Sequence, residues 1–212
     1  MMSERIFVTG IDTEVGKTVV SAILVEALQA DYWKPVQAGD LDNTDSHKVK
    51  DYVTNSVSEI HPEGFRLNTP ASPHVAARLD GVEVSLDKLN PPQVDNTLII
   101  EGAGGLMVPL NDEGEMMVDL LLKTATKVVL VSRNYLGSIN HTLSAFEVLK
   151  SKGVSVDLLV FSGKQNVETE AIIESYASPV KILRVPLFDK VDSIQIMSFS
   201  LKHKDHIFSE FS

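Results

Sequence analysis

The sequence predicts an α/β protein with a doubly wound, mostly parallel sheet that carries helices on both faces. Short, largely apolar segments typical of strands buried on both sides alternate with segments of helical periodicity. The chain has 212 residues, 43% of them hydrophobic, which suits a single domain over residues 1–212 with a sizeable core. It has no cysteine, which excludes a disulfide scaffold, a cysteine-ligated metal site and a cysteine nucleophile.

In the first half of the chain, strands are expected at residues 6–8, ending at Gly10, and at residues 32–33, where apolar side chains are consecutive. Residues 16–28 place apolar side chains three or four apart, which is the spacing of a helix face. A polar helix is expected over residues 43–53, with Val49, Tyr52 and Val53 facing inward. Residues 54–73 are expected to form a loop. At its end, Ser72-Pro73 supplies an N-cap and a first-turn proline for a helix that Gly81 ends.

In the second half, four apolar runs predict strands at residues 97–100, 127–132, 156–161 and 182–185. Helices are expected between them at residues 118–122, 138–150 and 168–176, and the second of these turns Leu143, Phe146 and Leu149 inward. The strand at residues 97–100 leads into Glu101 and then into a Gly-Ala-Gly-Gly turn. The pattern of residues 189–212 does not predict how the tail packs.

The charge balance bears on possible partners. Nineteen basic and 29 acidic residues give a net charge of −10, which argues against nucleic acid or an anionic membrane as the main partner. No apolar run approaches the roughly 18 residues of a membrane-spanning helix. Residues 1–10 lack the pattern of a signal peptide. We therefore expect a cytoplasmic protein that binds neither membranes nor nucleic acid.

The strongest chemical signal is a phosphate-binding loop between the first strand and the first helix, with the sequence Gly10-Ile11-Asp12-Thr13-Glu14-Val15-Gly16-Lys17-Thr18. In such a loop, backbone N–H groups surround phosphate oxygens at a helix N-terminus. Lys17 is expected to reach the outer phosphates, and Thr18 to offer its hydroxyl to magnesium. The loop has five residues between its glycines instead of the standard four, and the alternative is a chance Gly-Lys-Thr after a turn. The loop makes the fold one of the P-loop NTPase type.

Two further strand ends carry charged residues. Glu101 follows an apolar strand, where an acidic residue in phosphate-loop enzymes helps to hold magnesium; a solvent-facing acid is the alternative. Lys34 follows the strand at residues 32–33 and is expected at the same sheet edge, where it would stabilise a transferring phosphoryl group. The alternative for Lys34 is a solvated surface lysine, and Asp45 is either a magnesium ligand or a helix N-cap.

A second helix start is a candidate anion site. Gly137-Ser138-Ile139-Asn140 opens the helix at residues 138–150, and its free backbone N–H groups suit a carboxylate. An ordinary capped helix is the alternative. His141 is expected to be structural.

Taken together, these motifs resemble those of the dethiobiotin synthetase family. The resemblance rests on residues 9–18, Lys34-Pro35-Val36, Asn43-Thr44-Asp45, Ser72-Pro73-His74, Glu101-Gly102-Ala103-Gly104-Gly105, Leu136 to His141, and Pro186-Leu187. Their order and spacing cover residues 5–188, and the five-residue gap in the loop is typical of the family. The resemblance implies an ATP- and magnesium-dependent ligase that closes a cyclic urea from 7,8-diaminononanoate and carbon dioxide or bicarbonate. The product is dethiobiotin, formed through a carbamate and a carbamic–phosphoric anhydride.

The resemblance also implies roles for individual residues. Catalysis falls to Lys17, Lys34 and Thr13, and magnesium binding to Thr18, Asp45 and Glu101. Nucleotide binding is implied for Glu14, Val15, Gly16, Lys17, Thr18, Val19, Ser162, Pro186, Leu187 and Phe188. Substrate binding is implied for Thr13, Lys34, Ala38, Gly104, Gly137, Ser138, Ile139 and Asn140. Family members are homodimers with the substrate carboxylate at the subunit interface. Ala38 replaces a hydroxyl found in some members, and Ser162 replaces an adenine-reading asparagine.

Two other function classes fit the same loop. One is another ATP-dependent amide synthase, against which 212 residues leave no second domain for ammonia supply. The other is a partitioning-type ATPase switch. Such switches usually carry a second lysine early in the loop, and residues 10–15 have none. A requirement of ATP turnover for a small diamine, instead of a protein or membrane partner, would distinguish the ligase from the switch.

Overall fold

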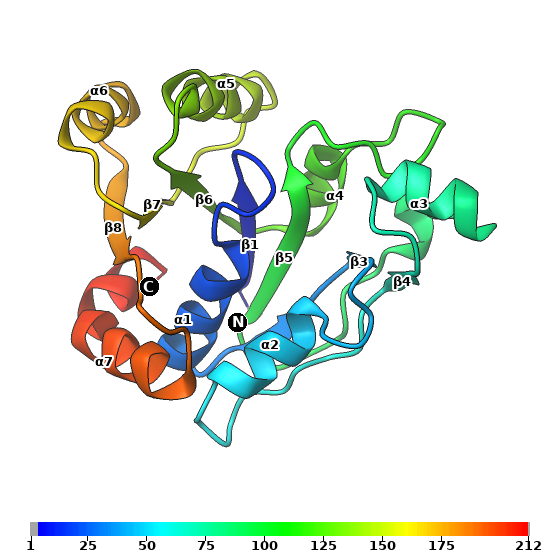
Figure 1. Cartoon of the computed structure of the whole chain (residues 1–212), viewed down its shortest axis with the longest axis horizontal. Helices are drawn as coiled ribbons and strands as arrows, with labels where there is room; N and C mark the ends of the chain where they lie inside the picture. Colours follow the sequence, from blue (N-terminus) through cyan, green and yellow to red (C-terminus); the bar gives the residue numbers. More distant parts are fainter. Residues whose placement is uncertain (1–3, 212) are drawn as a thin grey trace.

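The computed structural model describes residues 4–211, and its centre is a six-stranded parallel sheet in the order β2-β5-β1-β6-β7-β8 (Figure 1). The strands are β1 (Arg5–Gly10), β2 (Asp31–Trp33), β5 (Leu98–Gly105), β6 (Lys127–Arg133), β7 (Leu158–Gly163) and β8 (Lys181–Pro186). The chain runs to one side of β1 first and later to the other. The strand order therefore reverses beside β1, and in open α/β sheets ligands bind at such a reversal, at the carboxyl ends of the strands.

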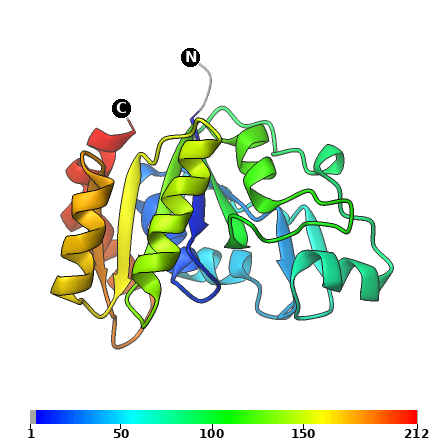
Figure 2. The ribbon, with the colours of Figure 1, turned by 90° about the horizontal axis from the view of Figure 1, so that it is seen from above.

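Helices cover both faces of the sheet, as Figure 2 shows. On one face, α1 (Lys17–Leu28), α2 (Asp45–Tyr52) and α7 (Ser193–Glu210) enclose one core cluster. On the other, α4 (Met117–Thr124), α5 (Ser138–Ser151) and α6 (Val167–Ala177) enclose a second cluster, which extends to α3 (Pro73–Asp80). The doubly wound α/β prediction is confirmed. The six main strands and the helices up to α6 lie within a few residues of their expected positions.

The loop expected over residues 54–73 is partly wrong, because it contains a strand. β3 (Val36–Ala38) and β4 (Phe65–Leu67) pair in parallel as a separate two-stranded sheet. Backbone N–H groups of Gly39 and Phe65 donate to carbonyls of the other segment at 2.8 Å. Strands of three residues are too short to show an alternating pattern, so their pairing is invisible in the sequence.

The turn expected after Glu101 is also wrong, because β5 continues through Gly105. A Cβ at Gly102 would lie 2.9 Å from the ring of Phe7, so the glycine allows β5 and the β1 side chain to approach closely. α3 begins where it was expected, with Ser72 at the N-cap and Pro73 at the first helical position, but without the expected side-chain cap bond. The Ser72 hydroxyl makes no cap bond to the helix and instead lies 3.1 Å from Nδ1 of His74.

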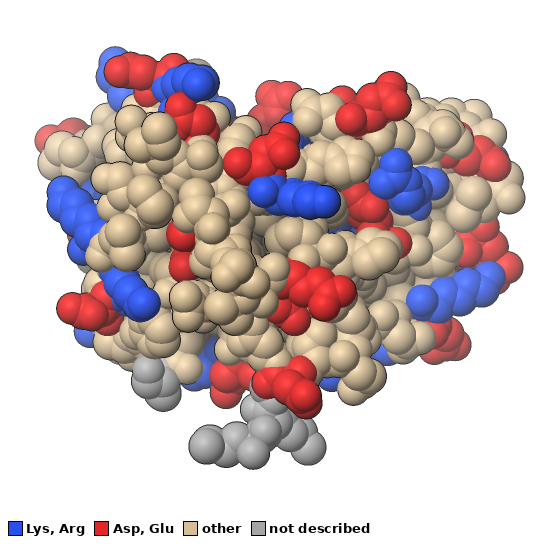
Figure 3. All heavy atoms as spheres, turned by 90° about the horizontal axis from the view of Figure 1, so that it is seen from below, with Lys and Arg blue, Asp and Glu red and all other residues tan. Residues whose placement is uncertain are grey.

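The tail that showed no clear pattern forms a helix: α7 packs along α1 and buries Ile196, Phe199 and Ile207. A short 3₁₀ helix, η1 (Leu86–Lys88), lies earlier in the chain, before β5. Among residues 4–211, no helix is both long and apolar enough to cross a membrane. Acidic and basic side chains are mixed over the face drawn in Figure 3.

Candidate active site

A cavity of about 770 Å³ opens near the carboxyl ends of β1 and β5, beside α1 and α2. Most of the site residues predicted from the sequence line it. These are Thr13, Glu14, Gly16, Lys17, Thr18, Val19, Lys34, Ala38, Asp45, Glu101 and Gly104. The cavity also has walls that the sequence did not indicate, formed by Gln37, Asp40, Lys48, Val108 and residues 70–71. Val15, within the loop, is buried and is absent from this lining.

Hydrogen bonds with β6 and within the loop itself fix the phosphate-binding loop. The Ile11 N–H donates to the Val131 carbonyl at 3.0 Å, and Arg133 Nη1 donates to the Glu14 carbonyl at 3.0 Å. Lys17 Nζ donates to the carbonyl of Asp12 at 2.7 Å, across the loop. No side chain caps the start of α1 at Gly16. The first turn of α1 therefore offers its backbone N–H groups to an anion, as a phosphate site requires.

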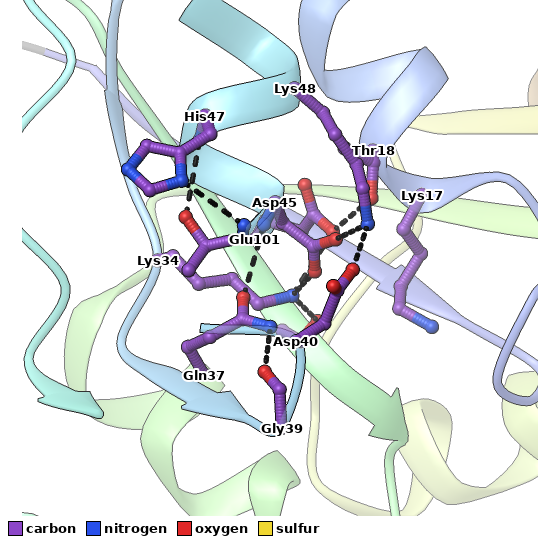
Figure 4. A network of polar contacts seen from close by, with 12 residues as sticks. Lys17, Thr18, Lys34, Gln37, Gly39, Asp40, Asp45, His47, Lys48 and Glu101 are labelled. Atoms are coloured by element: carbon purple, nitrogen blue, oxygen red, sulfur yellow. Dashed lines mark hydrogen bonds and ion pairs between the residues drawn. The ribbon is translucent and has the colours of Figure 1, made fainter. Parts of the chain in front are cut away.

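Glu101 is the centre of the polar network in Figure 4, with a side chain only 1% exposed. Its Oε1 accepts hydrogen bonds from Thr18 Oγ1 at 2.9 Å and from Lys34 Nζ at 3.1 Å. Its Oε2 accepts one from the hydroxyl of Tyr32 at 2.9 Å. Lys34 Nζ also lies 2.7 Å from Asp45 Oδ2, so one buried ammonium joins the two carboxylates. The structure thus brings together the residues expected at three separate points of the chain.

The charges in this network shift each other's pKa values. Burial lowers the pKa of Lys17 to about 8, and the nearby Lys34 ammonium adds to that effect. Burial acts in the same direction on Lys34, but the carboxylates of Glu101 and Asp45 outweigh it and raise the pKa of Lys34. Burial opposes ionisation of Asp45, yet Lys34 and Lys48 bring the pKa of Asp45 below its usual value. At neutral pH the network therefore holds charged lysine and aspartate side by side.

The donor set fits a magnesium ion that shares its ligands with a phosphate chain. Among residues 4–211, no group of three or more His, Cys, Asp or Glu side chains could hold a metal ion by itself. Thr18, Asp45 and Glu101 instead supply one hydroxyl and two carboxylates near one lysine. Magnesium prefers oxygen ligands and usually takes only one or two carboxylates, with phosphate and water oxygens for the rest.

β3, α2 and the segment between them contribute residues that sequence reasoning missed. Lys48 Nζ lies 3.0 Å from Asp40 Oδ2 and 3.7 Å from Asp45 Oδ1. The Gln37 side chain accepts from the Asp45 N–H at 3.1 Å and donates to the Gly39 carbonyl at 3.0 Å. The N-cap of α2 is Thr44, so Asp45 is free for another role. The spacing of Asp45 and Lys48, three residues apart on a helix, was the available signal.

Three of the four predicted nucleotide residues beyond the loop line a separate cavity of about 260 Å³. Ser162, Pro186 and Leu187 line it together with Arg184. It adjoins the loop, because a Cβ at Gly16 would lie 2.4 Å from Ser162 Oγ. Phe188 does not line this cavity and packs edge-on against Phe199, with ring centroids 5.9 Å apart.

The predicted carboxylate site at the start of α5 lies apart from the phosphate loop. Gly137, Ile139 and Asn140 line a third cavity, of about 750 Å³, which shares no residue with the cavity of the loop. Ser138 is 1% exposed and does not line it. No side chain caps this helix start, so its first-turn N–H groups, like those of α1, can donate to an anion. Within one chain, the two predicted halves of the substrate site are separate.

Comparisons with known proteins agree with the motifs. Residues 4–195 match a family profile described as an AAA domain. An ATP-dependent dethiobiotin synthetase BioD from Christiangramia forsetii is 51% identical over 193 residues, which are 90% of this chain and 92% of that protein. One from Cytophaga hutchinsonii is 45% identical over 204 residues, 96% of this chain and 98% of that protein.

Solved structures share the fold at much lower identity. The septum site-determining protein MinD from Pyrococcus horikoshii, complexed with Mg-ADP, superposes with a TM-score of 0.57 at 16% identity. The superposition covers 96% of this chain and 90% of that one. This likeness shows the P-loop NTPase-type fold and nothing about the reaction.

Proposed function

The chain belongs to the family of ATP-dependent dethiobiotin synthetases, and we propose that it converts 7,8-diaminononanoate, carbon dioxide and ATP into dethiobiotin, ADP and phosphate. The observation that supports this most is the content of the 770 Å³ cavity. It combines a phosphate-binding loop, two buried lysines and two carboxylates next to a threonine hydroxyl. That combination suits transfer of a phosphoryl group to a small, negatively charged acceptor.

The chemistry proceeds in three balanced steps. One amine of the substrate adds to carbon dioxide and loses a proton, which gives a carbamate. A carbamate oxygen attacks the γ-phosphorus of ATP, and the bond to the bridging oxygen breaks to release ADP. The second amine then attacks the carbonyl carbon of the resulting anhydride, loses a proton, expels phosphate and closes the ring. Phosphorylation is necessary because an unactivated carbamate oxygen is a poor leaving group.

The residues of this chain act mainly by position and charge. Lys17, at the end of the loop, neutralises the outer phosphates, and Lys34 stabilises charge on the carbamate and on the transferred group. Thr13, at the exposed side of the loop, lines the path between phosphate and substrate. Thr18, Asp45 and Glu101 would hold magnesium, which supplies charge neutralisation on the phosphate chain when it is bound.

The remaining predicted residues would bind the nucleobase of ATP and the diamine with its carboxylate. Ser162, Pro186 and Leu187 would enclose the nucleobase beside the loop. Ala38 and Gly104 border the space for the diamine. Gly137, Ile139 and Asn140 would bind the substrate carboxylate across a homodimer interface, because within one chain they line another cavity. Neither an amide synthase nor a partitioning-type switch is favoured, since the relatives matched at high identity are described as dethiobiotin synthetases.

Phosphate release from Mg-ATP with bicarbonate, with and without 7,8-diaminononanoate, tests the proposal. We expect release to require the diamine and to give one dethiobiotin per phosphate. Lys17→Ala should abolish release while the protein still folds, because it removes charge stabilisation worth several kcal/mol in such sites. Release that is indifferent to the diamine would overturn the proposed reaction.

A further inference from the structure

Tyr32 lies directly behind the polar network and has no contact with the cavity. It belongs to β2, is fully buried and lies in the core cluster on the face covered by α1. β2 pairs with β5 in register, with Tyr32 opposite Ile99 and two residues before the level of Glu101. Since alternate residues of a strand share a face, the Tyr32 side chain and the Glu101 side chain lie on the same side of the sheet.

The hydroxyl of Tyr32 holds the carboxylate of Glu101 in one orientation. Tyr32 donates to Oε2 at 2.9 Å, whereas Thr18 and Lys34 both donate to Oε1. The terminal torsion of a glutamate is broad, so the carboxylate has little intrinsic preference for this orientation. Without the hydroxyl, Oε2 would lose the one hydrogen-bond donor that it has among residues 4–211, which is costly for a buried charged group.

We propose that Tyr32 is a positioning residue for the reaction, which acts through Glu101 by holding its Oε1 toward Thr18 and Lys34. The inference rests on the proposed function only in taking Glu101 as a ligand of the magnesium that accompanies the nucleotide. A ligand held in one orientation binds the ion without first losing rotational freedom. Hydrogen-bond partners behind a metal ligand commonly change metal affinity or activity about 10- to 100-fold when they are removed.

Tyr32→Phe tests this with one atom removed and the ring retained. The expected result is an affinity for Mg-ADP lowered about tenfold, with the affinity for ADP in the presence of EDTA unchanged within about twofold. Calorimetric titration measures both. In phosphate release, the magnesium concentration for half-maximal rate should rise, while KM for the diamine stays constant.

Tyr176→Phe is the matched control, because Tyr176 also donates to a glutamate, Glu147, but between α5 and α6, away from the cavity. It should leave both affinities unchanged. Equal losses of affinity with and without magnesium in Tyr32→Phe would indicate a merely structural role and overturn the inference, as would no loss at all.

Combining Tyr32→Phe with Glu101→Gln separates an indirect effect from a direct one. If Tyr32 acts through Glu101, the double variant should bind Mg-ADP no more weakly than Glu101→Gln alone. Additive losses would overturn the inference. Because these titrations contain no diamine, they are decisive even if the proposed ring closure fails its own test.

Discussion

Lys17 gives the site a pH signature that binding measurements can detect. Its pKa is lowered to about 8 by burial and by Lys34, so in the free protein it loses its positive charge as the pH rises through that value. The affinity for ADP should therefore fall above pH 8, measured by titration between pH 6.5 and 9.5. Lys17→Arg should remove the inflection, because a guanidinium stays charged over this range. A constant affinity in the parent protein up to pH 9.5 would contradict the shift.

The same shift has a defined sign for stability. Between about 8 and the usual lysine value of 10.5, the unfolded chain binds the Lys17 proton more tightly than the folded one. The contribution of Lys17 to the free energy of unfolding therefore rises with pH in that window. Binding and stability should respond to pH in opposite directions there.

A substitution of Lys34 measures how strongly the stability of the protein depends on the buried ammonium between Asp45 and Glu101. Lys34→Met leaves the carboxylates of Glu101 and Asp45 without the ammonium between them. Removing one partner of a buried ion pair lowers the free energy of unfolding by about 3–5 kcal/mol, which urea denaturation at pH 7 measures. At pH 5 the loss should be smaller, because an unpaired buried carboxylate takes up a proton. Lys50→Met, at an exposed position of α2, should change the free energy of unfolding little. Equal losses for both variants would show that the ion pairs of Lys34 do not stabilise the network.

The predicted site residues that the structure brings together share one property: strand ends and the phosphate loop fix their positions. Lys34 follows β2, Glu101 lies within β5, and Lys17 begins α1 after the loop that follows β1, and a parallel sheet brings these positions together at one edge. Tyr32 was not identified because a tyrosine inside a buried strand has the same pattern as a core residue. Lys48 was not identified because a lysine on a polar helix has the same pattern as a solvated surface residue.

Two helices, α1 and α5, begin at a glycine in the left-handed region. Comparing substitutions at the two glycines separates the effect on the phosphate loop from the cost of backbone strain alone. Gly16 has φ +98° and Gly137 has φ +103°. A Cβ at Gly16 would lie 2.4 Å from Ser162 Oγ, whereas one at Gly137 has no heavy atom within 4 Å among the described neighbours. Gly137→Ala should cost about 1 kcal/mol of backbone strain and leave ADP binding intact.

Gly16→Ala should cost more in stability and also lower the affinity for ADP, because the loop must shift away from β7. Adding Ser162→Ala removes the nearest atom and should restore part of the lost stability. Urea denaturation and ADP titration of the four proteins measure both effects. Equal costs at the two glycines would show that the contact with Ser162 does not constrain the loop.

Elements were predictable where the chain is long enough to show a period. β1, β6 and α5 carry apolar patterns over six or more residues, and these fall close to their expected bounds. β3 and β4 have three residues each and depend on pairing with each other, which no local pattern encodes. α7 was not predicted because only a few of its residues are buried, and these pack against α1. Its apolar face is therefore recognisable only from the contact with α1.

At the scale of the whole molecule, the two parts of the proposed substrate site lie in separate cavities of one chain. The phosphate loop and the start of α5 line different cavities. At the cavity beside α5, Leu136 is fully exposed next to Tyr135. We place the proposed second subunit at this cavity, where an exposed apolar side chain lies next to an uncapped helix start. The resemblance could indicate such a dimer from sequence, but the surfaces that meet are determined by the fold.

Leu136→Asp tests the dimer and the divided site together. A buried charge at the interface would favour separate subunits, so we expect a dimer for the parent protein and a monomer for the variant in analytical ultracentrifugation. KM for the diamine should rise because the second half of the site is removed, while the affinity for ADP should persist because its loop lies within one chain. Leu201→Asp, at an exposed leucine of α7, is the control and should remain dimeric. A monomeric parent protein with full ring-closing activity would require both halves of the site to come from one chain, through a movement of α5 toward the loop.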